Sequence, residues 1–318
     1  MHALKILVTE PENYSLVALE TYRLLGQVDL GPLDDDGLAG KIAGYDVLVI
    51  RLGHIISRVL MEKADELKVI VSPTTGLDHI DLEAAAEKNI TVLSLKGETE
   101  FLRSIPATAE LTWGLLLALV RHIPQAYPSV LKGEWQRDRF RGHDLSGKTL
   151  GIVGLGRIGE KTARYGQAFG MRVIAFDPYR TEWPTGVEKM NSLKELLRRS
   201  EVLLVHVPLE KDTVGMFGAK ELSLLPPGAV LVNTSRGAVL DEAALLQALG
   251  NGHLAGAALD VVQNEAKFGV RSPLVRYAKM HGNLLLTPHL GGATVESMAM
   301  TEAFMADKLK RFLTAERK

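Results

Sequence analysis

The 318-residue chain contains no cysteine. Disulfides, thiolate nucleophiles and zinc sites built on cysteine are therefore excluded. The chain also lacks an excess of either charge, since 37 lysines and arginines stand against 38 aspartates and glutamates. Proteins that bind nucleic acid or an anionic membrane usually show a basic excess or a basic stretch. We therefore expect neither partner, although local basic clusters can still bind a small anionic substrate.

Long apolar runs and targeting segments are missing too. The most apolar stretch, Leu111–Val120, has about half the length needed to cross a bilayer, so we interpret it as a buried helix. Residues 1–14 enter a strand-like run without the basic, apolar and small-residue order of a signal peptide. We expect no export and a cytoplasmic location. No metal site is predicted, because no histidine or acid pair has ligand spacing on one element.

Length and apolar content favour two domains with separate cores, since 46% of the 318 residues are hydrophobic. In the N-terminal third, short aliphatic runs alternate with helix-like segments, which indicates a parallel sheet with covering helices. These runs are residues 4–9, 47–50, 68–71 and 90–93. The pattern weakens at 96–106, where glycine, proline and charges gather, and we place the first domain crossing there.

Residues 148–177 follow the order of a dinucleotide-binding unit: strand, glycine turn, helix, strand, acid. Gly154 permits the tight turn, Gly156 lets the backbone approach a pyrophosphate, and Gly159 lets the helix lie close to the strand. Free N–H groups at the start of the helix then face the phosphates. A glycine-rich loop without a ligand is the alternative, but the register of all five parts favours a cofactor site.

Asp177 ends the second strand of this unit. A carboxylate there can accept hydrogen bonds from both hydroxyls of an adenosine ribose, whereas a 2′-phosphate would meet a like charge. NAD is therefore favoured over NADP. Arg180 follows closely and can weaken that preference.

Beyond Asp177, polar residues recur where buried strands end, and four of them are Arg236, Asp260, Glu265 and His289. An arginine can bind a 2-oxo or 2-hydroxy carboxylate through two parallel charge-assisted hydrogen bonds. Histidine, with an unperturbed pKa of about 6.5, can exchange a hydroxyl proton near neutral pH. A carboxylate beside the imidazole fixes its tautomer and keeps it a proton donor, and Glu265 is the natural partner. Taken singly, each has a structural explanation as a surface charge, a loop acid or a capping histidine.

The first domain offers two further candidates. The loop 72–81 follows a strand directly and can present the backbone amides of Thr75 and Gly76 to a substrate carboxylate, although a plain turn is the alternative. Arg51 also ends a strand and can meet an anionic substrate. An ordinary surface arginine is the simpler explanation.

Seven motifs span most of the chain. They are TTGLDHID at 74–81, AELTWGLLLALVRHIPQA at 109–126, GKTLGIVGLGRIG at 147–159, HVPL at 206–209, NTSRGAVLDEAALLQAL at 233–249, GAALDV at 256–261 and TPHLGG at 287–292. With these motifs the chain resembles the D-isomer-specific 2-hydroxyacid dehydrogenases, and most of all their phosphoglycerate dehydrogenase branch. The resemblance implies an α/β fold of two Rossmann-like, doubly wound parallel-sheet domains. The NAD-binding domain (105–288) would be inserted into a substrate domain (1–104 and 289–318).

The resemblance also implies roles for single residues. Arg236 would bind the substrate carboxylate and carbonyl, His289 would act as acid and base, and Glu265 would tune that histidine. Asp260 would lie beside the nicotinamide carboxamide. Cofactor contact is implied for Thr75, Arg157, Ile158, Asp177, Val207, Pro208, Thr234, Ser235 and Asp260. A homodimer is implied as well, through the helix after Pro106 and the segment 133–147.

Some positions depart from the family pattern. Ala266 stands where a proline commonly follows the catalytic glutamate, Thr74 replaces a common glycine, and residues 267–272 are particular to this chain. These differences leave the substrate open. The chain ends at Lys318, so we do not expect the serine feedback that longer phosphoglycerate dehydrogenases exert through a C-terminal domain.

The sequence therefore predicts an NAD-dependent oxidoreductase that moves hydride between nicotinamide and C2 of a small D-2-hydroxy or 2-oxo acid. Candidate substrates are 3-phosphoglycerate or phosphohydroxypyruvate, glyoxylate and hydroxypyruvate. Arg51 and Arg103 are compatible with a phosphate-bearing substrate but do not select one. The alternative is an NAD-sensing interaction protein, since the fold also occurs in transcriptional corepressors that keep a similar catalytic set.

Overall fold

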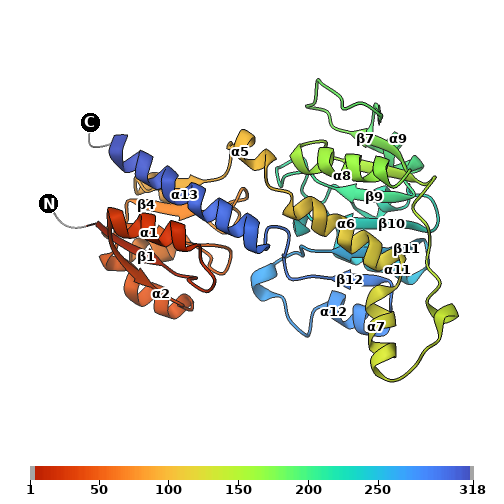
Figure 1. Ribbon diagram of the computed structural model, residues 1–318, viewed down its shortest axis with the longest axis horizontal. Helices are drawn as coiled ribbons and strands as arrows, with labels where there is room; N and C mark the ends of the chain where they lie inside the picture. Colours follow the sequence, from red (N-terminus) through yellow and green to blue (C-terminus); the bar gives the residue numbers. More distant parts are fainter. Residues whose placement is uncertain (1–3, 316–318) are drawn as a thin grey trace. The chain divides into compact units, whose positions relative to one another are not determined.

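The computed structural model describes residues 4–315, and of Ala266 only the backbone. The chain divides into unit 1, Met1–Ile105 with Thr294–Lys318, and unit 2, Pro106–Ala293. Each unit contains one sheet in which every strand pair is parallel. This confirms the predicted α/β fold class (Figure 1). Among the described helices, none combines the length and apolarity that a membrane crossing needs.

Unit 1 is built on a five-stranded sheet in the order β2-β1-β3-β4-β5. Its strands are β1 (Leu4–Val8), β2 (Gly26–Leu30), β3 (Val47–Val49), β4 (Val69–Ser72) and β5 (Thr91–Ser94). Its helices are α1 (Leu16–Leu25), α2 (Asp35–Lys41), α3 (Arg58–Glu62), α4 (Leu82–Glu87), α5 (Thr99–Arg103) and α13 (Val295–Ala315).

Strands β1, β3 and β4 of unit 1 bury side chains on both faces of the sheet, since successive side chains of a strand point to opposite sides. In β3, Val47 and Val49 join the core covered by α1, α5 and α13. Leu48 joins the other core, covered by α2, α3 and α4. The C-terminal helix α13 packs along α1, which is why the chain returns to this unit (Figure 1).

Unit 2 is built on a seven-stranded sheet in the order β12-β11-β10-β9-β6-β7-β8. Its strands are β6 (Thr149–Val153), β7 (Arg172–Phe176), β8 (Val187–Lys189), β9 (Val202–Val205), β10 (Ala229–Asn233), β11 (Leu254–Leu259) and β12 (Leu284–Leu286). Its helices are α6 (Ala107–Val120), α7 (Ile123–Leu131), α8 (Arg157–Ala168), α9 (Leu193–Arg199), α10 (Ala219–Leu222), α11 (Glu242–Gly250) and α12 (Pro273–Met280).

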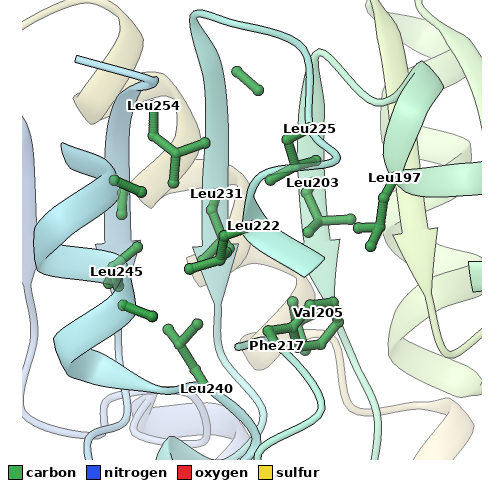
Figure 2. Close-up of a cluster of buried hydrophobic side chains, with 14 of the residues drawn as sticks. Leu197, Leu203, Val205, Phe217, Leu222, Leu225, Leu231, Leu240, Leu245 and Leu254 are labelled. Carbon is green, nitrogen blue, oxygen red and sulfur yellow. The ribbon is translucent and has the colours of Figure 1, made fainter. Parts of the chain in front are cut away.

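Two apolar layers enclose the sheet of unit 2. Helices α6 and α8 cover one face. Helices α9, α10, α11 and α12 cover the other face, where leucines of the helices and strands form one buried cluster that also contains Val205 and Phe217 (Figure 2). The strand order reverses at β6, which has β7 on one side and β9 on the other. Dinucleotides bind at such a reversal, beyond the carboxyl ends of the strands.

The return crossing between the units lies after Ala293, whereas the sequence analysis placed it after residue 288. The difference has a physical cause. The backbone amides of Leu290 and Gly291 donate to the Asp260 carboxylate at 2.7 and 2.8 Å, and Thr108 donates to the Gly291 carbonyl at 2.8 Å. These contacts keep the segment after β12 in unit 2.

Candidate active site

The glycine turn follows β6, and each of its glycines has a distinct environment. Gly154 has a φ of +88°, and a Cβ added there would lie 2.6 Å from the carbonyl oxygen of His206. A Cβ on Gly159 would lie 2.3 Å from the carbonyl oxygen of Gly154. A Cβ added at Gly156 would meet no described atom within 4 Å beyond its own chain neighbours and helix backbone. Gly154 and Gly159 therefore permit close packing, while Gly156 leaves open space at the start of α8.

Arg157 and Ile158 are the first residues of α8, where the free backbone N–H groups of the helix face outward. The Nη1 atom of Arg157 is buried and has no hydrogen-bond partner among the described residues. Burial lowers the pKa of its guanidinium. A buried unpaired donor is costly unless a ligand satisfies it. A cationic donor at a helix N-terminus suits a pyrophosphate, so these residues fit a dinucleotide.

Asp177 directly follows β7 and is held in place by backbone amides. Its Oδ2 accepts from the N–H of Leu155 at 2.9 Å, and its Oδ1 accepts from the N–H of Tyr179 at 3.0 Å. Each carboxylate oxygen can accept a further hydrogen bond. The carboxylate is thus fixed beside the glycine turn, and its predicted contact with ribose hydroxyls stays a prediction.

Val207 and Pro208 follow β9, the strand next to β6. The carbonyl oxygen of Pro208 accepts from the Thr213 hydroxyl at 2.7 Å, which braces the loop. Because His206 approaches Gly154 closely, both residues lie next to the glycine turn. Their predicted cofactor contact stays a prediction.

His206 itself has an unusual environment that predicts acid sensitivity. Its Nε2 lies 3.3 Å from the hydroxyl oxygen of Thr162, its Nδ1 is buried, and burial lowers its pKa from 6.5 to about 3. Because this pKa is lower in the folded than in the unfolded chain, the neutral ring contributes stability above pH 6.5, and that contribution is lost as the pH falls toward 3. When the pH is lowered from 6.5 to 5, the free energy of unfolding should fall in both proteins, and it should fall by about 2 kcal/mol less in His206→Gln than in the wild type.

Urea unfolding at several pH values measures this difference. His143→Gln is the matched control, because His143 is exposed and its replacement should leave the pH dependence of the wild type unchanged. An identical loss of stability in wild type and His206→Gln would contradict the prediction.

The segment after β10 shapes the loop that carries Arg236. Buried Asn233 accepts at Oδ1 from the backbone N–H and the hydroxyl of Ser235, at 3.0 and 2.8 Å. Its side-chain amide donates to the carbonyl oxygen of Arg236 at 3.0 Å. The Nη1 of Arg236 donates to the carbonyl oxygen of Ser235 at 2.7 Å. Asn233 was not among the predicted site residues, although a polar residue ending a buried strand was a signal for it.

Asp260 follows β11, is only 1% exposed, and anchors the loop that carries His289. Its carboxylate accepts from the Thr287 hydroxyl at 2.6 Å and from the amides of Leu290 and Gly291. The N–H of His289 donates to the Asp260 carbonyl at 2.9 Å. His289 has a φ of +55°, a conformation that costs energy and persists only where the surroundings impose it. This anchoring role was not predicted from the sequence.

His289 and Glu265 are brought together. The Nδ1 atom of His289 lies 2.7 Å from Oε2 of Glu265, with the two side chains 27% and 42% exposed. An ionised carboxylate only accepts hydrogen bonds, so Nδ1 carries a proton. This assignment leaves Nε2 as the ring atom that can exchange a proton with a substrate.

Arg236 and His289 belong to the same edge of the sheet. Three adjacent strands end in register, because Asn233 of β10 pairs with Leu259 of β11, which in turn pairs with Leu286 of β12. The residues that follow these ends emerge together at the carboxyl edge, where ligands bind in open α/β sheets. The structure therefore gathers the predicted guanidinium and imidazole at one edge of unit 2.

A chain of threonines links helix α6 to both loops of this edge. The hydroxyl oxygens of Thr112 and Thr234 lie 2.8 Å apart in the interior. Thr112 also donates to the carbonyl oxygen of Thr108, whose own hydroxyl donates to the carbonyl oxygen of Gly291. The contacts of Thr112 with Thr234 and of Thr108 with Gly291 join residues 122 and 183 positions apart in the sequence, so no local spacing pattern predicts them.

The remaining predicted residues lie in unit 1. Thr75 and Gly76 follow β4 in a loop braced by Thr74, whose hydroxyl donates to the carbonyl oxygen of Gly76 at 2.8 Å. Thr74, which departs from the family pattern, thus has a structural role that glycine could not fill. The predicted substrate contacts of Thr75 and Gly76 stay predictions.

Arg51 has its guanidinium engaged within unit 1. Its Nε and Nη2 donate to Oε1 of Glu302 at 2.9 and 2.5 Å, and its Nη1 donates to the carbonyl oxygen of Glu12 at 3.0 Å. The side chain of Glu302 is 1% exposed, and its burial raises the pKa of the carboxyl group. Substrate binding by Arg51 stays a prediction, and this ion pair favours a structural role in tying the end of β3 to α13.

Comparison with known proteins places this arrangement in a family. Residues 113–291 match the family described as D-isomer specific 2-hydroxyacid dehydrogenase, NAD binding domain. The chain belongs to the D-isomer specific 2-hydroxyacid dehydrogenases. The matched range contains the glycine turn, Arg236, Glu265 and His289. The family assignment and the predicted cofactor, NAD, are confirmed.

Several members of the family are similar over most of this chain. D-3-phosphoglycerate dehydrogenase of Methanocaldococcus jannaschii is 39% identical over 316 residues, 98% of this chain and 58% of that protein. Glyoxylate reductase of Thermococcus litoralis is 38% identical over 290 residues, 88% of this chain and 84% of that protein. The chain thus spans about half the length of the phosphoglycerate dehydrogenases that it matches, 58% and 49% for two of them.

Solved structures agree with this assignment. TT0316 protein from Thermus thermophilus has a TM-score of 0.84 at 34% identity, covering 98% of this chain and 97% of that chain. D-Lactate dehydrogenase from Aquifex aeolicus, complexed with NAD and lactic acid, has a TM-score of 0.84 at 27% identity, covering 98% and 96%. Likeness to both over nearly the whole length supports the fold of both units.

Proposed function

We propose that the protein is an NAD-dependent oxidoreductase that transfers hydride between nicotinamide and C2 of a small D-2-hydroxy or 2-oxo acid. The observation that carries this proposal is the 2.7 Å contact between His289 Nδ1 and Glu265, at the sheet edge that also bears Arg236. A guanidinium, a proton donor and a dinucleotide fold together suit the reduction of a 2-oxo acid better than any of them alone.

Each group has a defined task in this reaction. NAD supplies or accepts the hydride when bound. Arg236 binds the substrate carboxylate and fixes the orientation of C2. During reduction, Nε2 of His289 donates a proton to the oxygen that becomes negative, and in oxidation it accepts that proton. Glu265 stabilises the imidazolium and holds the ring so that Nε2 faces the substrate.

Glyoxylate, hydroxypyruvate and phosphohydroxypyruvate are the proposed substrates. The curated relatives named glyoxylate reductase, hydroxypyruvate reductase and D-3-phosphoglycerate dehydrogenase support this panel. The decisive experiment follows NADH absorbance with each 2-oxo acid in turn, alongside a titration of NADH alone. Oxidation of NADH with at least one acid is expected. NADH binding without oxidation on any of them would favour the NAD-sensing alternative.

We also propose a homodimer. The sequence-based prediction used the helix after Pro106, which is α6, and the segment 133–147. Because eight of the 14 residues of α6 are buried, we place the interface on α7 and the segment after it. Exposed apolar side chains gather there: Ile123, Tyr127, Leu131 and Trp135 are 52%, 65%, 70% and 87% exposed. Ile123, Tyr127 and Leu131 are spaced four residues apart and so lie along one face of the helix, and exposed apolar surface of this kind is typical of protein interfaces. Leu131→Asp should therefore shift the protein from dimer to monomer in analytical ultracentrifugation.

Leu24→Asp is the matched control for this shift, because Leu24 is 81% exposed on α1 of unit 1, outside the proposed interface. Its replacement should leave the sedimentation unchanged. A monomeric wild type, or dissociation by Leu24→Asp rather than Leu131→Asp, would contradict the proposed interface. The predicted cytoplasmic location stays a prediction.

A further inference from the structure

The loop after β7 brings a positive charge to the glycine turn. The guanidinium of Arg180 donates to the carbonyl oxygen of Leu155 and to the carboxylate of Glu160, while its Nε donates to the carbonyl oxygen of Glu182. Leu155 also donates its backbone N–H to Asp177. Asp177 thus accepts from the backbone N–H of Leu155, and Arg180 donates to the backbone carbonyl oxygen of the same residue. The two side chains are therefore close neighbours.

These two neighbours have opposite effects on the choice of cofactor. In dinucleotide-binding folds a carboxylate on the ribose hydroxyls favours NAD, whereas a nearby arginine accommodates the 2′-phosphate of NADP. Arginine is always charged, and its planar group suits the oxygens of a phosphate. With Arg180 free, the adenosine end of the site would combine one group that repels a 2′-phosphate with one that attracts it.

Glu160 changes this balance. It lies in the first turn of α8 and forms an ion pair with Arg180, and the two side chains are 30% and 23% exposed. A pair that is largely shielded from water is screened less by salt than an exposed one. All three guanidinium nitrogens already donate to protein acceptors. The charge of Arg180 is compensated, and its donors are directed toward the turn.

An acidic residue in the first turn of a helix also interacts favourably with the helix dipole. That effect alone does not account for the position of Glu160, because the same helix end suits the phosphates of the cofactor. An uncompensated carboxylate there would repel the pyrophosphate. The pairing with Arg180 removes this repulsion and at the same time occupies the arginine.

We infer that Glu160 is a specificity-determining residue, which excludes NADP by engaging the guanidinium of Arg180. NAD selectivity then depends on two carboxylates. Asp177 repels the 2′-phosphate, and Glu160 prevents Arg180 from binding it. This inference concerns the cofactor alone, so it does not depend on the substrate.

Equilibrium titrations of NADH and NADPH, followed by their fluorescence without any substrate, test the inference. In Glu160→Gln, the affinity for NADPH relative to NADH should rise about tenfold, because one charge-assisted contact with the phosphate becomes available. In Glu160→Gln/Arg180→Gln, the ratio should return to within about twofold of the wild type. The gain should shrink as salt is added, since it arises from charge.

Two further variants complete the set. Asp177→Ala should also raise the affinity for NADPH relative to NADH. This variant is the positive control, since it tests whether the titration detects a change of selectivity. Glu188→Gln is the matched control, because the Glu188 carboxylate on the edge strand β8 pairs with Arg172 and Arg199 rather than with Arg180, so the ratio should stay unchanged. Thermal unfolding of each variant shows that it is folded. Glu160→Ala replaces the glutamine variant if that one is unstable, since it frees Arg180 in the same way.

Two results would overturn the inference. An unchanged ratio in folded Glu160→Gln would show that Glu160 has no part in selectivity. A raised ratio that persists in the double variant would show that Glu160 acts by its own charge rather than through Arg180.

Discussion

Replacement of His289 by asparagine is expected to lower kcat about a thousandfold, because the alkoxide formed at C2 would lose its proton donor. Asparagine is the suitable replacement, since the φ of +55° at this position is tolerated by asparagine better than by most residues. The affinity for NADH should stay within about twofold, because the glycine turn, Arg157 and Asp177 are untouched. Stopped-flow turnover with the best 2-oxo acid and a fluorescence titration of NADH measure the two effects separately.

Glu265→Gln should have a smaller effect of the same kind. A glutamine can still accept a hydrogen bond from Nδ1, which lies 2.7 Å from the carboxylate, but it does not stabilise the imidazolium by charge. We expect a fall in kcat of about ten- to a hundredfold. The exposed His143→Gln variant should retain full activity. Retained turnover in His289→Asn would remove this histidine from the reaction.

The local parts of the site were predictable from the sequence. The glycine turn with Asp177 could be proposed because its steric and electrostatic demands fall within one short segment of the chain. Arg236 and His289 could be proposed because each follows an aliphatic run that is typical of a buried strand. A parallel sheet then gathers such strand ends at one edge without any further information.

The contacts that hold these residues in place were not predictable. Thr108 and Gly291 are hydrogen-bonded although they lie 183 residues apart in the sequence, and Arg51 and Glu302 are paired although they lie 251 residues apart. No spacing in the sequence indicates such pairs, because they depend on how helices pack. For the same reason, ligand binding and a surface position were the two predictions for Arg51, and its buried partner Glu302 was not predicted.

The carboxylate of Asp260 provides the second large expected effect. Three donors, the Thr287 hydroxyl and the amides of Leu290 and Gly291, converge on it at 2.6 to 2.8 Å. Asp260→Ala would leave these donors without a partner inside the protein. Hydrogen bonds to a charged group contribute about 1.5–3 kcal/mol each, and partial relaxation of the loop would recover some of the loss. We expect the free energy of unfolding to fall by about 3 kcal/mol.

Asp260→Asn separates anchoring from the cofactor contact that the family resemblance implies. The asparagine oxygen can keep the contacts with Thr287 and Leu290, but its NH₂ group would face the N–H of Gly291, donor against donor. The loop would shift and His289 would lose its imposed conformation, so kcat should fall about a hundredfold while NADH affinity changes by less than about threefold. If Asp260 acts mainly on the nicotinamide, NADH affinity should fall as much as kcat does.

Gly291→Ala disturbs the same loop without touching the charge. An added Cβ would lie 3.2 Å from Oδ2 of Asp260 and 3.3 Å from Cγ2 of Thr108, so both neighbours would have to move slightly. If anchoring is the main role of Asp260, this variant should reproduce a smaller version of the Asp260→Asn result: kcat lowered about tenfold with NADH affinity preserved. Full activity in Gly291→Ala together with weak NADH binding in Asp260→Asn would assign the buried carboxylate to the cofactor and leave the position of His289 to its contact with Glu265.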